Sequence, residues 1–448
     1  MGGPPPLTAR QAFWALVSAL LTVGMSSLDM AMANTALPTI AASLQVAPAQ
    51  SVWVINAYQL AMMASLLPFA ALGDWLGPRR VCLGGLLGFV LASAACALSQ
   101  DMTQLTLARA AQGLCNGALM SVNLALVKLV VPADRLGRGV GLNALVVGLG
   151  FTLGPTVTSA VLALASWHWL FAISIVLAIA ALLLAWPALP RTPGGHGVDP
   201  VTALLTATTF GALMGAMATA AQRMAWPLPL GLALLALLAG ALLLRRQAGH
   251  PAPMLPVDLL RLPMFSLSVL TSLAAFATQG LAFVGLPFYF QYSLGHDAVT
   301  TGLLMTPWAG VVALAAPVAG RLSDHHPPGL LGGVGMAILA LGMAAIAALP
   351  TSAGPLAIGA CMALCGAGFG LFQAPNLKAL MSAAPAGRIG GASGMVAMAR
   401  LTGQSLGAAA VALCFSLAGP AGPTWALLLG ACTATLAAVA SGARLRLP

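Results

Sequence analysis

The chain has 448 residues, of which 60% are hydrophobic and 6% charged, and its formal net charge is +10. Soluble domains carry about 25% charged residues, so this composition excludes a water-soluble globular fold and predicts a polytopic membrane protein. The 18 basic residues are spread along the chain and form no basic patch, which argues against a nucleic-acid partner. Neither a phosphate-binding loop nor metal-ligand spacing is found, so we expect no enzyme, no metal site and no cofactor.

Fourteen apolar runs are long enough to cross a bilayer as helices. Long stretches of Leu, Ala, Val and Gly favour helices over the short alternating segments of a β-barrel, so an all-α membrane protein with fourteen spans is expected. The predicted spans are residues 12–35, 50–72, 80–99, 103–127, 138–164, 167–188, 200–221, 227–244, 264–291, 298–320, 329–349, 354–377, 389–417 and 422–442.

Lys and Arg residues are distributed unevenly over the connections between these runs. Fifteen fall at the termini and alternate connections, Arg223 alone falls on the other side, and Arg109 and Arg400 lie within helices. Because cytoplasmic loops carry an excess of Lys and Arg, both termini are predicted to be cytoplasmic.

The chain also repeats itself. A shift of 253 positions aligns Gly113 with Gly366 and Asn123 with Asn376. Parallel repeats of this kind have a pseudo-axis along the membrane normal and a site between the halves near the middle of the membrane. We therefore predict a six-helix bundle over residues 1–190, a linker with two extra spans over 191–262, and a second six-helix bundle over 263–448.

Asp29, in the first predicted span, is the only acidic residue within an apolar run. All eight acidic residues are Asp, and the other seven fall in polar connections. A charge at the centre of a membrane helix costs about 2.5–3.5 kcal/mol on insertion, and removal from water favours the neutral, protonated form of a carboxylic acid. Asp29 is therefore the candidate proton carrier, and the alternative is a structural Asp bonded to helix ends or to Asn34.

Five stretches carry motif-like patterns: Leu28–Pro38 and residues 70–80, 107–113, 148–155 and 320–324. They resemble motifs of the major facilitator superfamily, specifically its fourteen-helix drug:proton antiporter branch. Leu28–Pro38 is similar to the first-helix signature of that branch, with Ala31 where Thr is usual. The other resemblances are residues 70–80 with the motif of the loop between helices two and three, residues 320–324 with a weaker second copy, residues 107–113 with the fourth-helix motif, and residues 148–155 with the antiporter motif of helix five.

The resemblance implies a role for each motif. Asp74 would latch the inner gate against the other half; the alternative is a loop acid satisfied by its own arginines. The gating residues are Asp74, Gly77, Arg79, Arg80 and Asp324. Close packing of the antiporter motif would rest on Gly148, Gly150, Gly154 and Pro155, although its usual trailing Gly pair is missing.

Arg109 cannot lose its proton, so within a helix it must pair with a carbonyl, an acid or water. The resemblance implies that it assists proton transfer at Asp29 or holds the substrate cavity, and the alternative is an Arg that reaches the membrane surface. Polar and aromatic residues within the predicted helices complete the candidate cavity: Asn34, Trp53, Asn56, Tyr58, Gln59, Gln112, Asn116, Asn123, Gln279, Phe283, Gln373, Asn376 and Arg400.

Together these features predict a monomeric transporter of the bacterial cytoplasmic (inner) membrane. It would export small lipophilic, cationic compounds in exchange for protons by alternating access, with the proton gradient as its energy source and membrane lipid as its surroundings. One alternative is a transporter specific for one metabolite. Another is a membrane sensor or lipid-handling protein that does not transport, because a fold does not fix a function.

Overall fold

The computed structural model describes residues 8–131, 136–190, 200–221, 225–247, 257–385 and 389–446. Every regular element in these residues is a helix, as expected where backbone groups must bond internally in lipid. The long helices are α1 Ala9–Ser43, α3 Trp53–Leu76, α4 Pro78–Ala97, α5 Met102–Val130, α6 Leu136–Leu164, α7 His168–Ala188, α8 Pro200–Ala221, α9 Pro227–Gln247, α10 Pro263–Phe288, α11 Ala298–Leu322, α12 Pro328–Ala347, α13 Pro355–Ala383, α14 Ile389–Ala418 and α15 Gly422–Ala443. Short elements are α2 Pro48–Ser51, η2 Val257–Arg261, η3 Tyr289–Ser293, η5 Gly419–Ala421 and η6 Arg444–Arg446.

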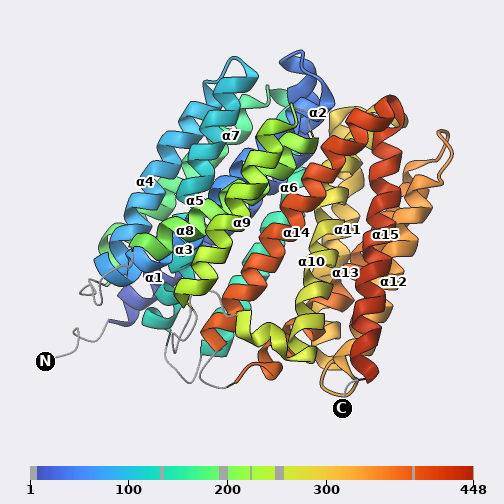
Figure 1. Ribbon diagram of the computed structural model, residues 1–448. Coiled ribbons are helices and arrows are strands. Elements are labelled where there is room, and N and C mark those ends of the chain that lie inside the picture. The colour runs from blue at the N-terminus through green and yellow to red at the C-terminus, as the bar shows by residue number, and fades with distance from the viewer. Residues whose placement is uncertain are drawn as a thin grey trace, which may run out of the picture.

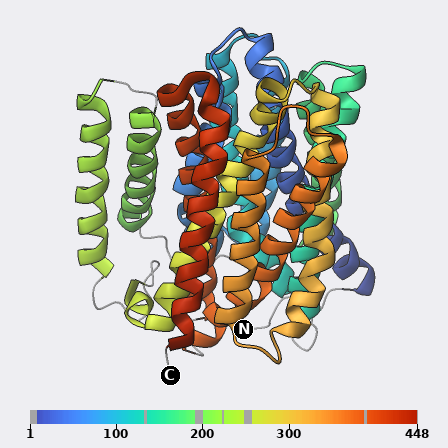
Figure 2. The same ribbon diagram turned by 90° about the vertical axis from the view of Figure 1, so that its right-hand side faces the viewer.

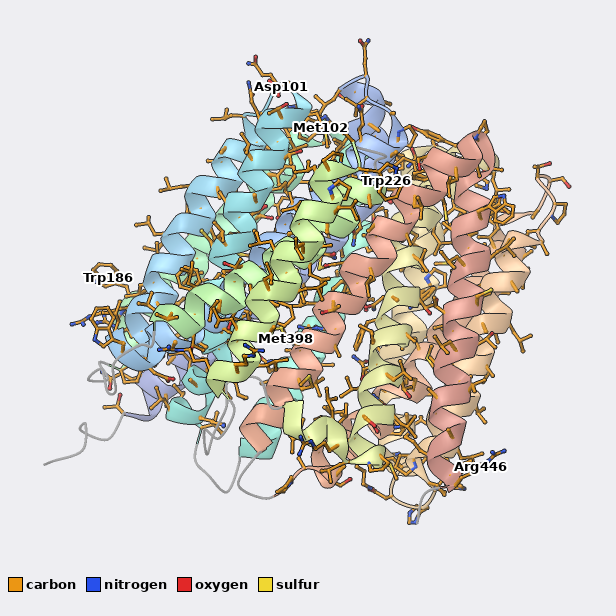
Figure 3. The ribbon with its side chains drawn as sticks, in the orientation of Figure 1. Asp101, Met102, Trp186, Trp226, Met398 and Arg446 are labelled. Carbon is orange, nitrogen blue, oxygen red and sulfur yellow. The ribbon has the colours of Figure 1, made fainter. Side chains whose placement is uncertain are left out.

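The helices form one bundle with two distinct ends. α1 begins and α15 ends at the same end, drawn at the bottom of Figure 1, which we call the lower end. Asp101, which caps α5, lies at the opposite, upper end, and Arg446 lies at the lower end (Figure 3).

The helix contacts repeat in the same order in the two halves. In the first half α1 packs against α6 and α7, α3 against α5, and α4 against α5 and α7. In the second half α10 packs against α14 and α15, α11 against α13, and α12 against α13 and α15. The repeated glycines fit this scheme, because Gly113 of α5 lies against the backbone of Tyr58 and Gly366 of α13 lies against the backbone of Trp308. The packing thus agrees with the sequence repeat.

α8 and α9 pack on each other at one side of the bundle (Figure 2). α8 also contacts α3 of the first half and α14 of the second. Phe210 of α8 packs against a buried cluster in which Met62 and Met63 of α3 meet Met398 and Leu401 of α14. α8 therefore covers the line along which α3 and α14 meet.

Among the described residues, twelve helical segments are long and apolar enough to cross a membrane. The number differs from the fourteen predicted spans for two reasons. α14 and α15 are joined by a short turn and fall in one segment, Gly394–Arg446, while α8 contributes only the shorter apolar stretch Val201–Leu213. The finding is an all-helical membrane protein with about twelve apolar spans, and the prediction of fourteen is not supported.

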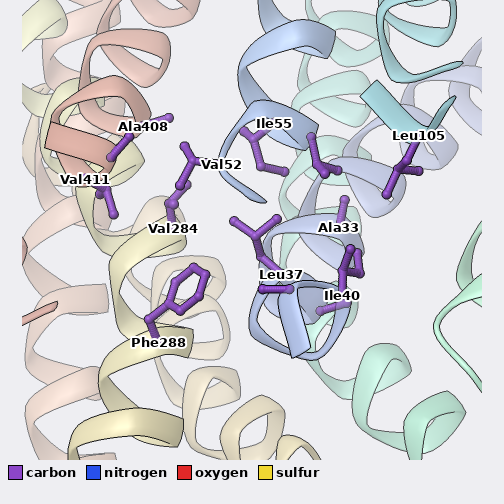
Figure 4. Close-up of a cluster of buried hydrophobic side chains, with 14 of the residues drawn as sticks. Ala33, Leu37, Ile40, Val52, Ile55, Leu105, Val284, Phe288, Ala408 and Val411 are labelled. Atoms are coloured by element: carbon purple, nitrogen blue, oxygen red, sulfur yellow. The ribbon is translucent and has the colours of Figure 1, made fainter. Parts of the chain in front are cut away.

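A cluster of buried apolar side chains joins the two halves towards the upper end. It contains Leu37 of α1 and Val52 from the first half, and Val284, Phe288 and Phe415 from the second. Figure 4 shows Val52 and Leu37 between the first-half helices and the α10 residues Val284 and Phe288. We call this cluster the upper seal.

Some predictions fall on residues that the structure does not describe. The orientation count used Arg135, Arg191, Arg223 and Arg388, which lie outside the described residues. The predicted domain boundary at residue 191 also lies outside them.

Candidate functional site

Asp29 lies at the centre of a buried cluster built from three helices of the first half. Its side chain is 1% exposed. Arg109 Nη1 of α5 lies 2.7 Å from Asp29 Oδ2. Gln112 Nε2 of α5 donates to Asp29 Oδ1 over 3.0 Å, and Ser174 Oγ of α7 donates to the same atom over 2.8 Å. We call these four side chains the Asp29 cluster.

Arg109 is fully buried and is held by more than the carboxylate. Its Nε donates to the carbonyl of Val54 over 3.2 Å. The guanidinium carbon lies 4.1 Å from the ring centroid of Tyr58 and 5.7 Å from that of Phe171. A cation over an aromatic face is stabilised by the ring quadrupole, more so when desolvated. One nitrogen, Nη2, has no hydrogen-bond partner.

The ion pair changes the electrostatic expectation for Asp29. The sequence indicated a lone acid that burial would keep protonated, whereas the structure supplies a buried cation in direct contact. The carboxylate of Asp29 and the guanidinium of Arg109 lie in contact as an ion pair. In this arrangement the Asp29 cluster therefore holds a compact pair of charges whose sum is zero.

Ser174 was not among the site residues predicted from the sequence. It is one of very few polar residues within α7, which is otherwise almost wholly apolar. A serine in a membrane helix often bonds only its own backbone, so the residue type alone carried little signal. Its position facing Asp29 could be known only once α1 and α7 were seen to pack together.

A ring contact followed by hydrogen bonds leads from the Asp29 cluster towards the interface between the halves. Tyr58, whose ring lies against Arg109, accepts a hydrogen bond from Asn116 Nδ2 over 2.7 Å. Ser26 Oγ donates to Asn116 Oδ1. Ser26 and Asn116 both line a cavity. Side-chain contacts through Tyr58 and Asn116 therefore connect the buried ion pair to that cavity.

Two adjoining cavities lie between the halves. The main cavity, of about 80 Å³, is bounded by α6 of the first half and by α10, α11, α13 and α14 of the second. The side cavity, of about 40 Å³, is bounded by α1, α3, α5, α6 and α14. Both are lined by Val147, Phe151, Arg400 and Gln404. Because α10 and α14 run from the lower to the upper end, these residues lie below the upper seal.

The main cavity has an aromatic wall. The ring of Phe283 lies 6.1 Å from that of Phe151 and 5.6 Å from that of Trp308. Phe276 and Phe369, 5.8 Å apart, add a second pair. Gln404 Nε2 donates to Gln279 Oε1 over 2.8 Å, which fixes one amide pair at the wall.

The predicted cavity residues separate into four groups. Asn116, Gln279, Phe283, Gln373 and Arg400 line the two cavities. Tyr58 and Gln112 belong to the Asp29 cluster or touch it. Buried side-chain atoms without a hydrogen-bond partner occur on Asn34, Asn56 and Gln59. Trp53, Asn123 and Asn376 are not among the residues that line these two cavities.

Asn123 and Asn376, which the repeat aligns, have different surroundings. Asn123 Nδ2 donates to Asn143 Oδ1 over 2.9 Å. Asn376 Nδ2 donates to Ser272 Oγ over 2.7 Å and its Oδ1 accepts from Arg444 over 2.8 Å. Asn376 thus helps to hold the buried guanidinium of Arg444 near the lower end of the second half.

The predicted gating residues lie at the lower end. Asp74 is exposed, and within the described part of the chain it makes no hydrogen bond or ion pair. Gly77 has φ of 89° between α3 and α4, a conformation that favours glycine. Arg79 donates to the carbonyl of Trp186 over 2.6 Å, and Asp324 pairs with Lys378 at 2.7 Å. No contact of Asp74 with the second half is thus found among the residues that the structure describes.

The glycine motif of α6 brings that helix against α1 beside Asp29. Gly150 lies against Ser27 and the backbone of Gly24, and Gly154 lies against Ala31. A side chain at either position would overlap α1, whereas Gly148 faces open space. The glycines therefore permit close contact between α6 and α1.

The opposite face of α6 bonds to α11 of the second half. Thr152 Oγ1 donates to the carbonyl of Ala309 over 3.2 Å, and Ser159 Oγ donates to the carbonyl of Val299 over 2.8 Å. Thr156 and Thr306 share a hydrogen bond of 2.9 Å. α6 thus contacts both the Asp29-bearing helix α1 and α11 of the second half.

Comparison with known proteins gives relatives along the whole chain. The chain is 46% identical over 447 residues to an uncharacterized transporter, YebQ of Escherichia coli, covering 99% of this chain and 97% of that protein. It is 27% identical to the riboflavin transporter RibZ of Clostridioides difficile, with coverage of 89% and 87%. It is also 27% identical to the multidrug efflux pump LfrA of Mycolicibacterium smegmatis, with coverage of 91% and 82%.

The fold matches solved transporter structures. A bacterial homologue of the human lysosomal transporter Spinster, in an inward-facing and unoccupied conformation, aligns with a TM-score of 0.71 over 98% of both chains at 13% identity. Residues 19–408 match the sequence profile of the Major Facilitator Superfamily. Because this match covers most of the chain and agrees with the fold, the protein is a membrane transporter that belongs to the Major Facilitator Superfamily.

Proposed function

We propose that the protein exports amphipathic compounds from the cytoplasm in exchange for protons that bind Asp29. The observation that carries this proposal is the fully buried Asp29–Arg109 pair. Its guanidinium lies against the ring of Tyr58, and Tyr58 accepts a hydrogen bond from Asn116 at the wall of a cavity between the halves. A buried ion pair is weak evidence for stability, since apolar residues of similar size often serve as well. An intramembrane acid is by default a functional site, and proton relays are one of its common uses.

Protonation of Asp29 would weaken the whole cluster. The neutral acid no longer balances the charge of Arg109 and no longer attracts donors from Gln112 and Ser174. A shift of α1 would then pass to α6 through their glycine contact, and from α6 to α11 through the hydrogen bonds of Thr152 and Ser159. This route supports a coupling between proton binding and the relative position of the two halves.

The arrangement described suits a state that receives substrate from the cytoplasm. The upper seal lies towards one end, the cavities lie below it, and among the described residues Asp74 makes no ion pair with the second half. The excess of Lys and Arg favours a cytoplasmic lower end, and with it cytoplasmic termini in a bacterial inner membrane. In the proposed cycle Asp29 has released its proton before substrate loads, and it is protonated again when the upper end opens.

We further propose that α8 and α9 form an additional membrane hairpin, as in the fourteen-helix drug:proton antiporter branch. Pro227–Arg246 is long and apolar enough to span. α8 is 22 residues long and packs along both α9 and α3, so its threonines can bond its own backbone while the hairpin lies in lipid.

The test compares wild type with Asp29→Asn in a host that lacks its own efflux pumps. Resistance to a panel of lipophilic compounds is measured, with expression checked by immunoblot. Asp101→Asn is the matched control, since Asp101 caps α5 at the upper end and Asn also caps helices. We expect wild type and Asp101→Asn to protect and Asp29→Asn to fail. Absence of protection by wild type would refute export, and equal protection by Asp29→Asn would refute coupling at Asp29.

A second candidate is a transporter for one metabolite, as RibZ is named for riboflavin. The small cavities, the fixed Gln279–Gln404 pair and the single cation at Arg400 favour it. Competition distinguishes the two functions. A specific transporter would be saturated by one compound and unaffected by unrelated dyes, whereas a multidrug exporter would be inhibited by many.

A further inference from the structure

Arg400 is an uncompensated positive charge in the substrate path. It is half-buried in the middle of α14 and lines both cavities between the halves. No acidic side chain is among the residues that line either cavity. Within the described residues, no hydrogen bond or ion pair joins Arg400 to another side chain. Because a guanidinium stays protonated, this charge is permanent.

Asp29 does not compensate this charge. Its two carboxylate oxygens are engaged by Arg109, Gln112 and Ser174, and the side chain is 1% exposed. Asp29 and Arg109 already sum to zero charge. The cavities therefore present a net positive charge to whatever enters them.

The other residues that line the main cavity favour flat aromatic ligands. Phe151, Phe283 and Trp308 form a continuous aromatic surface on one side of the main cavity. Aromatic rings pack on such a surface in offset or edge-on geometry. The amides of Gln279, Gln373 and Gln404 supply neutral hydrogen-bonding groups.

We propose that the cavity binds planar aromatic compounds that carry an anionic group, such as an aromatic carboxylate, and that Arg400 is the counter-ion of that group. A carboxylate matches the planar fork of a guanidinium and can bond it twice. This inference rests on the proposed function, since it names the substrate class of the exporter. It replaces the expectation of cationic substrates, because no acidic side chain lines the cavities and a cation there would lie beside Arg400.

The test uses three probes of the same shape and different charge: 2-naphthoate, 2-naphthamide and 2-naphthylmethylammonium. Binding to the purified full-length protein in lipid nanodiscs is measured by equilibrium dialysis near neutral pH. We expect 2-naphthoate to bind about tenfold or more tightly than 2-naphthamide, as for a hydrogen bond to a charged group. The cationic probe should bind most weakly.

Three variants identify the charge that makes the difference. Arg400→Gln should remove the preference for 2-naphthoate over 2-naphthamide, and Arg400→Lys should keep part of it. Arg261→Gln is the matched control, because Arg261 is an exposed arginine at the lower end outside both cavities. Size-exclusion profiles confirm that each variant is folded, and retained binding of the neutral probe shows that its cavity is intact.

The outcomes separate this inference from the proposed function. Strongest binding of the cationic probe, no binding of any probe up to millimolar concentration, or an unchanged preference in Arg400→Gln would overturn the inference. Export by proteoliposomes is measured in parallel with an imposed pH gradient. If 2-naphthoate binds through Arg400 but its movement ignores the gradient and Asp29→Asn, the coupled function fails while the substrate class stands. Gradient-driven export of the cation alone would give the opposite result.

Discussion

At the scale of single residues, Asp29 and Arg109 each lower the free-energy cost of burying the other's charge in the interior of the first half. Removing one partner of a buried pair leaves an unbalanced charge and costs about 3–5 kcal/mol, while replacing both partners can be neutral or stabilising. Here the remaining charge would have no solvent access, since both side chains are at most 1% exposed. The consequences for stability should therefore be strongly non-additive.

Arg109→Gln is thus expected to lower the unfolding temperature markedly, and the double variant Asp29→Asn with Arg109→Gln to recover most of the loss. Thermal unfolding in detergent, followed by tryptophan fluorescence, measures both. The double variant should still be inactive in transport, because the proton site is gone. A loss in the double variant equal to the sum of the losses in Asp29→Asn and Arg109→Gln would show that the pair is not energetically coupled.

The sequence was sufficient to identify Asp29 and Arg109 as candidate functional residues, but it could not predict that their side chains are in contact. Asp29 stood out because a carboxylate in an apolar run is costly, and Arg109 because a guanidinium in a helix needs a partner. Their contact spans 80 positions and depends on how α1 and α5 cross. Asn376 shows the opposite case. Its alignment with Asn123 in the repeat suggested that the two residues have the same role, but in the structure Asn376 accepts a hydrogen bond from Arg444.

At the scale of helices, α6 belongs to the first half and contacts both α1 of that half and α11 of the second half. Its glycine face lies on α1, and its hydroxyl face bonds to α11. The glycine face was predicted from its motif. The hydroxyl face was not, because Thr152, Thr156 and Ser159 have partners about 150 positions later in the chain. A serine or threonine that bonds its own helix gives the same sequence pattern as one that bonds a neighbour.

Gly154→Ala tests whether the close contact of α6 with α1 matters for transport. A methyl group at position 154 would overlap Ala31, and overpacking of this kind costs about 1–3 kcal/mol. We expect a lower unfolding temperature and a reduced rate of proton-coupled export. Gly84→Ala is the control, since the added methyl group meets open space on α4 and Gly84 lines neither cavity. Similar behaviour of the two variants would mean that the glycines matter for some reason other than this contact.

At the scale of the whole molecule, the repeat forecast two bundles related by a common packing order, and the helix contacts follow that order. The sequence could not forecast which end is closed. The same residues must serve states open to either end, and the two differ by only a few kcal/mol in such proteins. The upper seal is a property of one of these states.

Charge movement during a full cycle gives the last prediction. If Asp29 is the only proton site, one proton enters for each substrate that leaves. Export of a monovalent cation then moves no net charge, export of a neutral compound moves one, and export of a monovalent anion moves two. A membrane potential acts on each charge with about 2.3 kcal/mol per 100 mV, so about 4.6 kcal/mol per 100 mV drives export of an anion.

The measurement uses proteoliposomes without a pH gradient, in which valinomycin and potassium set the potential. Accumulation of 2-naphthoate should rise steeply with the potential in wild type and should not do so in Asp29→Asn. Accumulation that ignored the potential would show that the cycle moves compensating charge elsewhere, and that Asp29 is not the sole coupling site.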